Sequence, residues 1–163
     1  MENPINERTG QPYYAGSADN IKSLTTVLGL DGGRLSRITP EKIYYYMNLA
    51  EEYIDGYLEE YYFTPILQKS QWFPNNVTKL VFPVRIVRCA QYLAAGLMLQ
   101  SEFQALEPNA NESVQTYIND SKKELYMMTI YNTRLQGQTI KNALHTAPPS
   151  MMPAMPPNDS MFT

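Results

Sequence analysis

Hydrophobic residues recur at three- and four-residue steps in four stretches of the chain, which is the pattern of amphipathic α-helices. The clearest stretch covers residues 38–66. Thr39 is placed to cap this helix, Pro40 suits its first position, and Pro65 disfavours helix at the residue before it. Its predicted inner face consists of Ile43, Met47, Ala50, Ile54, Tyr57, Leu58 and Tyr61.

The opposite face of this helix is polar and acidic, so we expect it to face solvent or a partner. It carries Tyr45, Asn48, Glu52, Asp55 and Glu59. Gly56 lies in the middle of the helix, where it costs about 1 kcal/mol relative to alanine. Close approach of another backbone would account for it.

Three further helices are predicted around this one. Ser17 or Asp19 can cap a short helix, and its inner face is Ile21, Leu24, Thr25 and Leu28. Residues 83–103 are apolar on nearly all sides and predict the most buried helix. A third long helix covers about residues 112–135. Its inner stripe is Val114, Ile118, Ser121, Leu125 and Met128.

The helical body therefore covers residues 17–137, and the remaining segments lack helical period. Residues 1–16 predict an extended N-terminal arm that orders only against something else. Residues 66–82 predict a β-hairpin or a long ordered loop, in which Trp72 fills a small local core or anchors an interface with Phe73. The expected class is thus all-α, a small bundle of three long or medium helices plus a short N-terminal helix, with extended arms at both ends.

Composition argues against catalysis. The chain has a net charge of −3, one cysteine (Cys89) and one histidine (His145), so an internal disulfide and a Cys/His metal site are excluded. A nucleophilic pair of these two residues would need the tail to lie over a helix interior. We expect no enzyme, no cofactor and no bound metal. No signal peptide opens the chain, and the apolar run near Cys89 is too short for a bilayer, which favours a soluble protein of a reducing compartment.

Surface composition favours protein contacts instead. The 13 tyrosines exceed what a core of this size needs, and tyrosine is enriched at interfaces. Arg85 and Arg88 lie one turn apart at a helix start, where the dipole disfavours them, so we expect acidic partners. These partners are Asp55 or Glu59 of the same chain, or acids of a neighbouring subunit.

Several short runs, taken together, resemble the head–tail adaptor (connector, head-completion) proteins of tailed bacteriophages. They are LGL at residues 28–30, ITPE at 38–41, AEEYIDGYL at 50–58, PV at 83–84 and AQYLA at 90–94. The similarity covers roughly residues 17–135. The insertion around Trp72, the many tyrosines and the Pro/Met-rich tail depart from the family pattern.

The resemblance implies a structural virion protein of the neck, made in the host cytoplasm. Such proteins form rings, usually dodecameric, that dock under the portal, extend the DNA channel and join the head to the tail. The implied partners are other copies of the chain, the portal, a tail or further neck protein, and DNA that passes without sequence-specific binding, with no membrane. The alternative is a small cytoplasmic helical DNA-binding or regulatory protein. The candidate interface residues are Tyr45, Glu52, Asp55, Glu59, Trp72, Phe73, Arg85, Arg88, Met151, Met152, Met155, Met161 and Phe162.

The C-terminal tail covers residues 138–163, and from residue 147 onward its proline- and methionine-rich sequence cannot form a helix or a core. Solvated linkers rarely carry so many apolar side chains. It is either a disordered terminus or a strap that lies along a neighbouring subunit, the portal or the next tail protein.

Overall fold

The computed structural model of the chain describes residues 4–27, 37–67, 82–103 and 110–130, together with Leu135, Gln138 and Lys141. These residues form four α-helices and one short two-stranded antiparallel hairpin. The predicted all-α class, with three longer helices and a short N-terminal one, is therefore confirmed.

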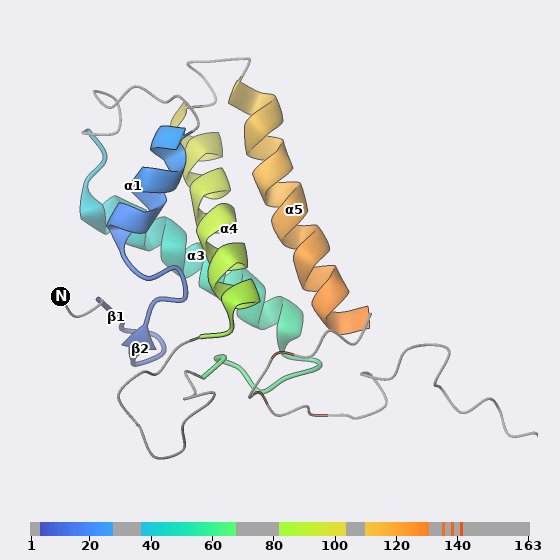
Figure 1. Cartoon of the computed structure of the whole chain (residues 1–163). Helices are drawn as coiled ribbons and strands as arrows, with labels where there is room; N and C mark the ends of the chain where they lie inside the picture. The colour runs from blue at the N-terminus through green and yellow to red at the C-terminus, as the bar shows by residue number, and fades with distance from the viewer. Residues whose placement is uncertain are drawn as a thin grey trace, which may run out of the picture.

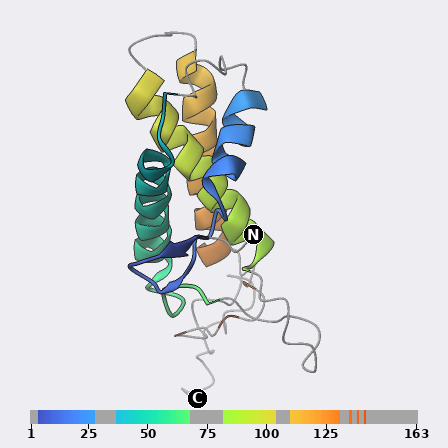
Figure 2. The same ribbon diagram turned by 90° about the vertical axis from the view of Figure 1, so that its left-hand side faces the viewer.

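The helices form two layers. They are α1 (Ala18–Val27), α3 (Pro40–Leu58), α4 (Val84–Phe103) and α5 (Ala110–Ile130). Figures 1 and 2 show α3 as one layer, which crosses obliquely behind a second layer made of α1, α4 and α5. The central helix α4 contacts each of the other three, as expected of a helix that is apolar nearly all round.

Helix α3 begins where the sequence predicts. Thr39 is the N-cap with an extended backbone, its hydroxyl accepts the Lys42 N–H, and Pro40 occupies the first turn. The predicted inner face is confirmed, since Tyr57 and Tyr61 are partly buried and the other five residues are fully buried. Those five are Ile43, Met47, Ala50, Ile54 and Leu58.

The helix ends at Leu58, several residues before Pro65, and the carbonyl groups just beyond this end are bonded by a residue distant in sequence. Lys141 donates its Nζ to the carbonyl oxygen of Glu59 and its backbone N–H to that of Tyr61. A cation at the C-terminal end of a helix satisfies carbonyls that lack a partner within the helix.

Helices α4 and α5 pack closely at one point. A Cβ added to Gly96 would lie 2.7 Å from Cγ1 of Ile118, so only glycine fits there without a shift. The predicted inner stripe of α5 is fully confirmed, because Val114, Ile118, Ser121, Leu125 and Met128 are all buried.

The N-terminal arm differs from the prediction. It is not extended and does not need another molecule, because it forms the hairpin β1 (Ile5–Asn6) and β2 (Gln11–Pro12) and packs on its own chain. Gly10, with φ of 68°, completes the turn, and its N–H donates to the carbonyl of Asn6. The reason for the difference is a set of buried polar contacts to α3, given below.

Two predicted features lie outside the described residues. They are the hairpin or loop between Ile66 and Phe82, with Trp72 and Phe73, and the tail beyond Lys141. The tail holds the candidate interface residues Met151, Met152, Met155, Met161 and Phe162.

Candidate interaction surface

Two carboxylates of α3, Glu51 and Asp55, lie one turn apart and are only 0% and 6% exposed. Glu51 is fully satisfied by the hairpin segment. Its Oε1 accepts the backbone N–H of Tyr14 at 2.5 Å, and its Oε2 accepts the Asn6 amide at 2.6 Å. A buried carboxylate needs such donors, because desolvation of an unpaired charge is costly.

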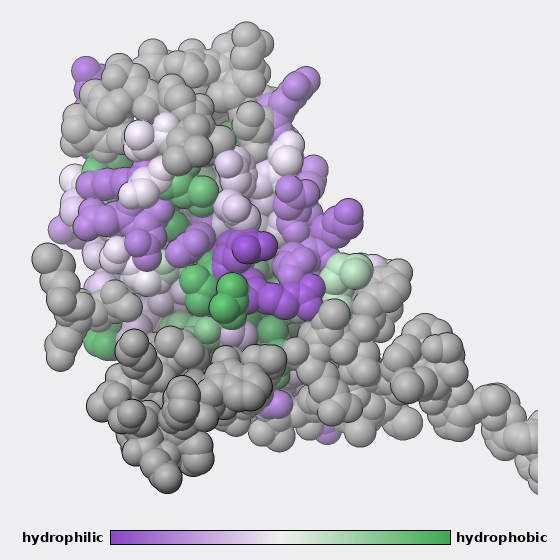
Figure 3. Space-filling model, in the orientation of Figure 1, coloured by the Kyte–Doolittle hydropathy of each residue, from purple (hydrophilic) through white to green (hydrophobic). Residues whose placement is uncertain are grey.

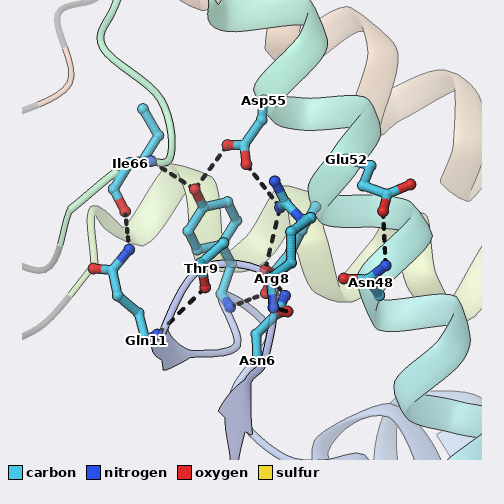
Figure 4. A network of polar contacts seen from close by, with 10 residues as sticks. Asn6, Arg8, Thr9, Gln11, Asn48, Glu52, Asp55 and Ile66 are labelled. Carbon is cyan, nitrogen blue, oxygen red and sulfur yellow. Dashed lines mark hydrogen bonds and ion pairs between the residues drawn. The ribbon is translucent and has the colours of Figure 1, made fainter.

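Asp55 binds two side chains of the same segment. It accepts the Tyr14 hydroxyl at 2.7 Å and the Arg8 guanidinium at 2.8 Å. The Tyr14 oxygen also accepts the backbone N–H of Ile66 at 2.6 Å. Figure 4 shows Arg8 reaching Asp55 from the hairpin. The prediction that Asp55 is an interface residue is therefore wrong, since the hairpin covers it.

Burial sets the proton affinity of these groups. It raises the pKa of Glu51 from 4.5 to about 7, although the hydrogen bonds from Tyr14 and Asn6 offset part of this effect. Burial, followed by the nearby Asp55 carboxylate, also raises the pKa of the Tyr14 hydroxyl.

The sequence alone did not predict the part that four residues of this network play, namely Asn6, Arg8, Tyr14 and Glu51. One signal was present: Glu51 follows Met47 by one turn, so it belongs to the inner face.

The opposite side of α3 is a row that faces away from the body. Met47 and Gly56 are nine residues apart, which is two and a half helical turns, so burial of Met47 directs Gly56 outward. We call this the outer row. It consists of Glu41, Tyr45, Asn48, Glu52, Gly56 and Glu59, of which Asn48 is half-buried and the rest are exposed.

The outer row contains three of the predicted interface residues, Tyr45, Glu52 and Glu59, and the structure places all three at the surface. Tyr45 is 58% exposed. Glu52 accepts the Asn48 amide at 2.8 Å, beside the Arg8–Asp55 contact on the same helix (Figure 4). The acidic face is thus real, but Asp55 is not part of it.

Within the described part of the chain, no packing contact accounts for a glycine at position 56. A Cβ added there would meet no described atom within 4 Å. The backbone whose close approach was predicted is therefore not among the described residues of this chain.

Two open pockets flank α3. One, of about 470 Å³, lies beside the hairpin, where the Tyr13 and Tyr44 rings stack at 5.4 Å between centroids. The other, of about 390 Å³, lies between α3 and α4 and begins at Tyr45. It is lined by Tyr45, Tyr46, Leu49, Leu97, Gln100 and Ser101.

The two predicted arginines have different environments. Arg85 pairs through Nε with Oε1 of Glu124 on α5, not with Asp55 or Glu59. Arg88 is exposed and makes no ion pair with another described residue. The difference follows from the fold, because the Arg85 side of α4 faces α5 and α3 lies on another side.

The described residues contain neither a reactive thiol nor a metal-binding cluster. Burial raises the pKa of the Cys89 thiol to about 12, which keeps it protonated and unreactive. His145 lies outside the described residues. No group of three His, Cys, Asp or Glu in the described ranges could hold a metal ion. None of the described helices is both long enough and apolar enough to cross a membrane.

Comparisons of the chain with models of protein families, with curated proteins and with solved structures found no match.

Proposed function

We propose that the chain is a structural virion protein, a ring-forming head–tail adaptor that docks under the portal, extends the DNA channel and joins the head to the tail. The residue runs that resemble phage head–tail adaptors suggest this role. It requires binding surfaces and no catalytic residues, so the protein acts by assembling and not as an enzyme.

The observation that carries the proposal is the outer row of α3. It combines the exposed ring of Tyr45, exposed carboxylates, and a mid-helix glycine that packs against no described residue of the chain. A glycine at such a position lowers helix stability by about 1 kcal/mol. A contact made only in an assembly offsets that cost.

The net charge of the chain favours passage of DNA without binding. With a net charge of −3 it lacks the excess of cations that binds phosphates, so passing DNA is not retained. The partners in this proposal are other copies of the chain, the portal, and a tail or further neck protein in the virion. No membrane takes part.

The test is the mass of the purified chain, alone and mixed with the portal protein of the same genome, together with peptide detection in purified virions. We expect rings, or monomers that form rings on the portal, and presence in virions. A monomer or dimer that ignores the portal, is absent from virions and binds a DNA site would overturn the proposal in favour of a small regulatory protein.

A further inference from the structure

We propose that copies of the chain associate head to tail, with the outer row of α3 of one copy receiving Val84 and Arg88 of the next. This inference rests on the proposed ring and names the surfaces that form it. The partner that binds the outer row is a second copy of the same chain, whose geometry, charge and spacing match it.

The two surfaces lie on opposite sides of the molecule. Leu97 lines the pocket between α3 and α4, so its side of α4 faces α3. Arg88 precedes Leu97 by nine residues, two and a half turns, and therefore points away from α3. At the Gly56 end the outer row likewise points away from the body, because Gly56 lies two and a half turns from the buried Met47. Two different patches on opposite sides form a heterologous contact, which closes into a ring when the rotation between copies allows it.

The charges of the two surfaces are complementary. Glu41, Glu52 and Glu59 are exposed and make no ion pair with any residue that the structure describes. Lys42, which follows Glu41, is held by Glu102 at 2.8 Å, and the Lys141 Nζ donates to the backbone carbonyl of Glu59 and not to its carboxylate. Across the molecule Arg88 is the cation left over at the start of α4.

The other charges near Arg88 offset one another and do not offset its positive charge. Arg85 and Glu124 neutralise each other, and the exposed Asp120 and Lys123 of α5 offset each other. Lys122 lies over the Tyr53 ring, 5.8 Å from its centroid, and so faces the α3 side. Electrostatic complementarity of this kind fixes the register of two copies.

The spacing of the contact groups also matches. Val84 and Arg88 are four residues apart on α4, and Glu52 and Gly56 are four apart on α3. Val84 is 74% exposed, and Figure 3 shows hydrophobic surface over the start of α4 bordered by strongly hydrophilic side chains. With Val84 seated over Gly56, Arg88 lies one turn away, within reach of Glu52. A side chain larger than hydrogen at position 56 would hold the two helices apart.

A charge exchange tests the contact in the full-length chain. Glu52→Lys and Arg88→Glu should each raise the protein concentration needed for half-maximal ring formation by about tenfold or more, since each places like charges together. The double variant Glu52→Lys/Arg88→Glu should recover assembly, because in a head-to-tail ring every contact is then complementary again. Glu112→Lys, an exposed glutamate of α5, is the matched control and should assemble as wild type.

Gly56→Ala gives an independent test, because it should change monomer stability and ring assembly in opposite directions. It should raise the melting temperature of the monomer, because alanine favours helix and no described atom lies within 4 Å, and it should weaken assembly at least several-fold. If Gly56→Ala stabilises the monomer and leaves rings unchanged, the α3 surface is not the contact.

The outcomes separate this inference from the proposed function. If the wild-type chain forms no ring even with the portal, the adaptor role fails. If the wild-type chain forms rings but both single charge reversals assemble normally, or the double variant is not rescued, the role stands and the proposed contact is overturned.

Discussion

The Tyr14 hydroxyl donates a hydrogen bond to Oδ1 of Asp55 over 2.7 Å, and the same oxygen accepts the Ile66 N–H over 2.6 Å. One buried ring therefore joins the N-terminal hairpin, α3 and the chain that follows α3. This arrangement fixes the hairpin on the body and removes Asp55 from the surface.

Tyr14→Phe should lower the free energy of unfolding by about 1–3 kcal/mol. The reason is that the Ile66 N–H loses its partner and Asp55 loses one of its two donors, both in a buried site. Urea denaturation followed by circular dichroism measures the change. Tyr45→Phe, at an exposed ring, is the control and should change stability by less than about 0.5 kcal/mol. Equal effects of the two variants would contradict the network.

Glu51 should make the chain less stable as pH rises from about 4.5 to about 7. Its pKa in the folded protein is raised from 4.5 to about 7 by burial, so the folded state binds the proton more tightly than the unfolded state. This contribution to stability is full below about pH 4.5 and is lost by about pH 7. Its size is about 3 kcal/mol.

The comparison that isolates Glu51 is Glu51→Gln, whose side chain does not titrate. Unfolding free energies of both proteins across this pH range should show a steeper fall for the wild type, by about 3 kcal/mol. Parallel pH profiles would show that Glu51 titrates alike in both states, contrary to its burial.

Much of the helical fold could be predicted because it depends on local pattern. The spacing of Val114, Ile118, Ser121, Leu125 and Met128 placed every one of them in the core, since a helix places such residues on one face whatever its neighbours. The α3 start was predictable for the same reason, because capping by Thr39 involves residues within one turn.

The hairpin contacts could not be predicted because they join distant residues. Asn6 and Glu51 are 45 positions apart, and the pattern around Asn6 carries no period. Asp55 has the sequence position of a surface acid and becomes buried only because Arg8 and Tyr14 arrive from outside the helix. Likewise, Arg85 pairs with Glu124 of α5, and this pairing depends on how α4 and α5 pack.

Gly96→Val should destabilise the chain by about 1–3 kcal/mol. A Cβ at this position already overlaps Ile118 Cγ1 at 2.7 Å, so α4 and α5 must separate or the side chain must leave its rotamer. Thermal or urea unfolding checks this. Gly56→Val is the matched control in a helix with open space around the glycine, and it should lie within about 0.5 kcal/mol of wild type in the monomer. A Gly96 variant as stable as this control would rule out the tight contact.

A double-mutant cycle should distinguish the two arginines. Arg85→Ala and Glu124→Ala should show a coupling free energy of about 0.2–1 kcal/mol, small because both side chains are about a third exposed. Arg88→Ala with Glu124→Ala should show almost none. Coupling of Glu124 to Arg88 rather than Arg85 would reverse our assignment of the internal pair.

Deleting residues 148–163 should leave monomer stability unchanged and weaken attachment to the portal or tail partner. The last described anchor of the C-terminal segment is Lys141, whose backbone N–H and Nζ bind the end of α3, and this deletion keeps it. The Pro/Met composition of the deleted segment suits docking along an irregular groove, because proline limits the entropy lost and methionine adapts its shape.

A longer truncation after Gly137 serves as the contrast for this tail prediction. It removes Lys141 and also Gln138, which donates to the Leu67 carbonyl at 2.9 Å, so it should lower stability by about 0.5–1.5 kcal/mol for each hydrogen bond lost. Melting curves and the mass of the complex with the portal separate the two effects. If the shorter truncation binds its partner as tightly as wild type, and the tail is cut by protease in the intact assembly, the tail is a disordered end and the strap is excluded.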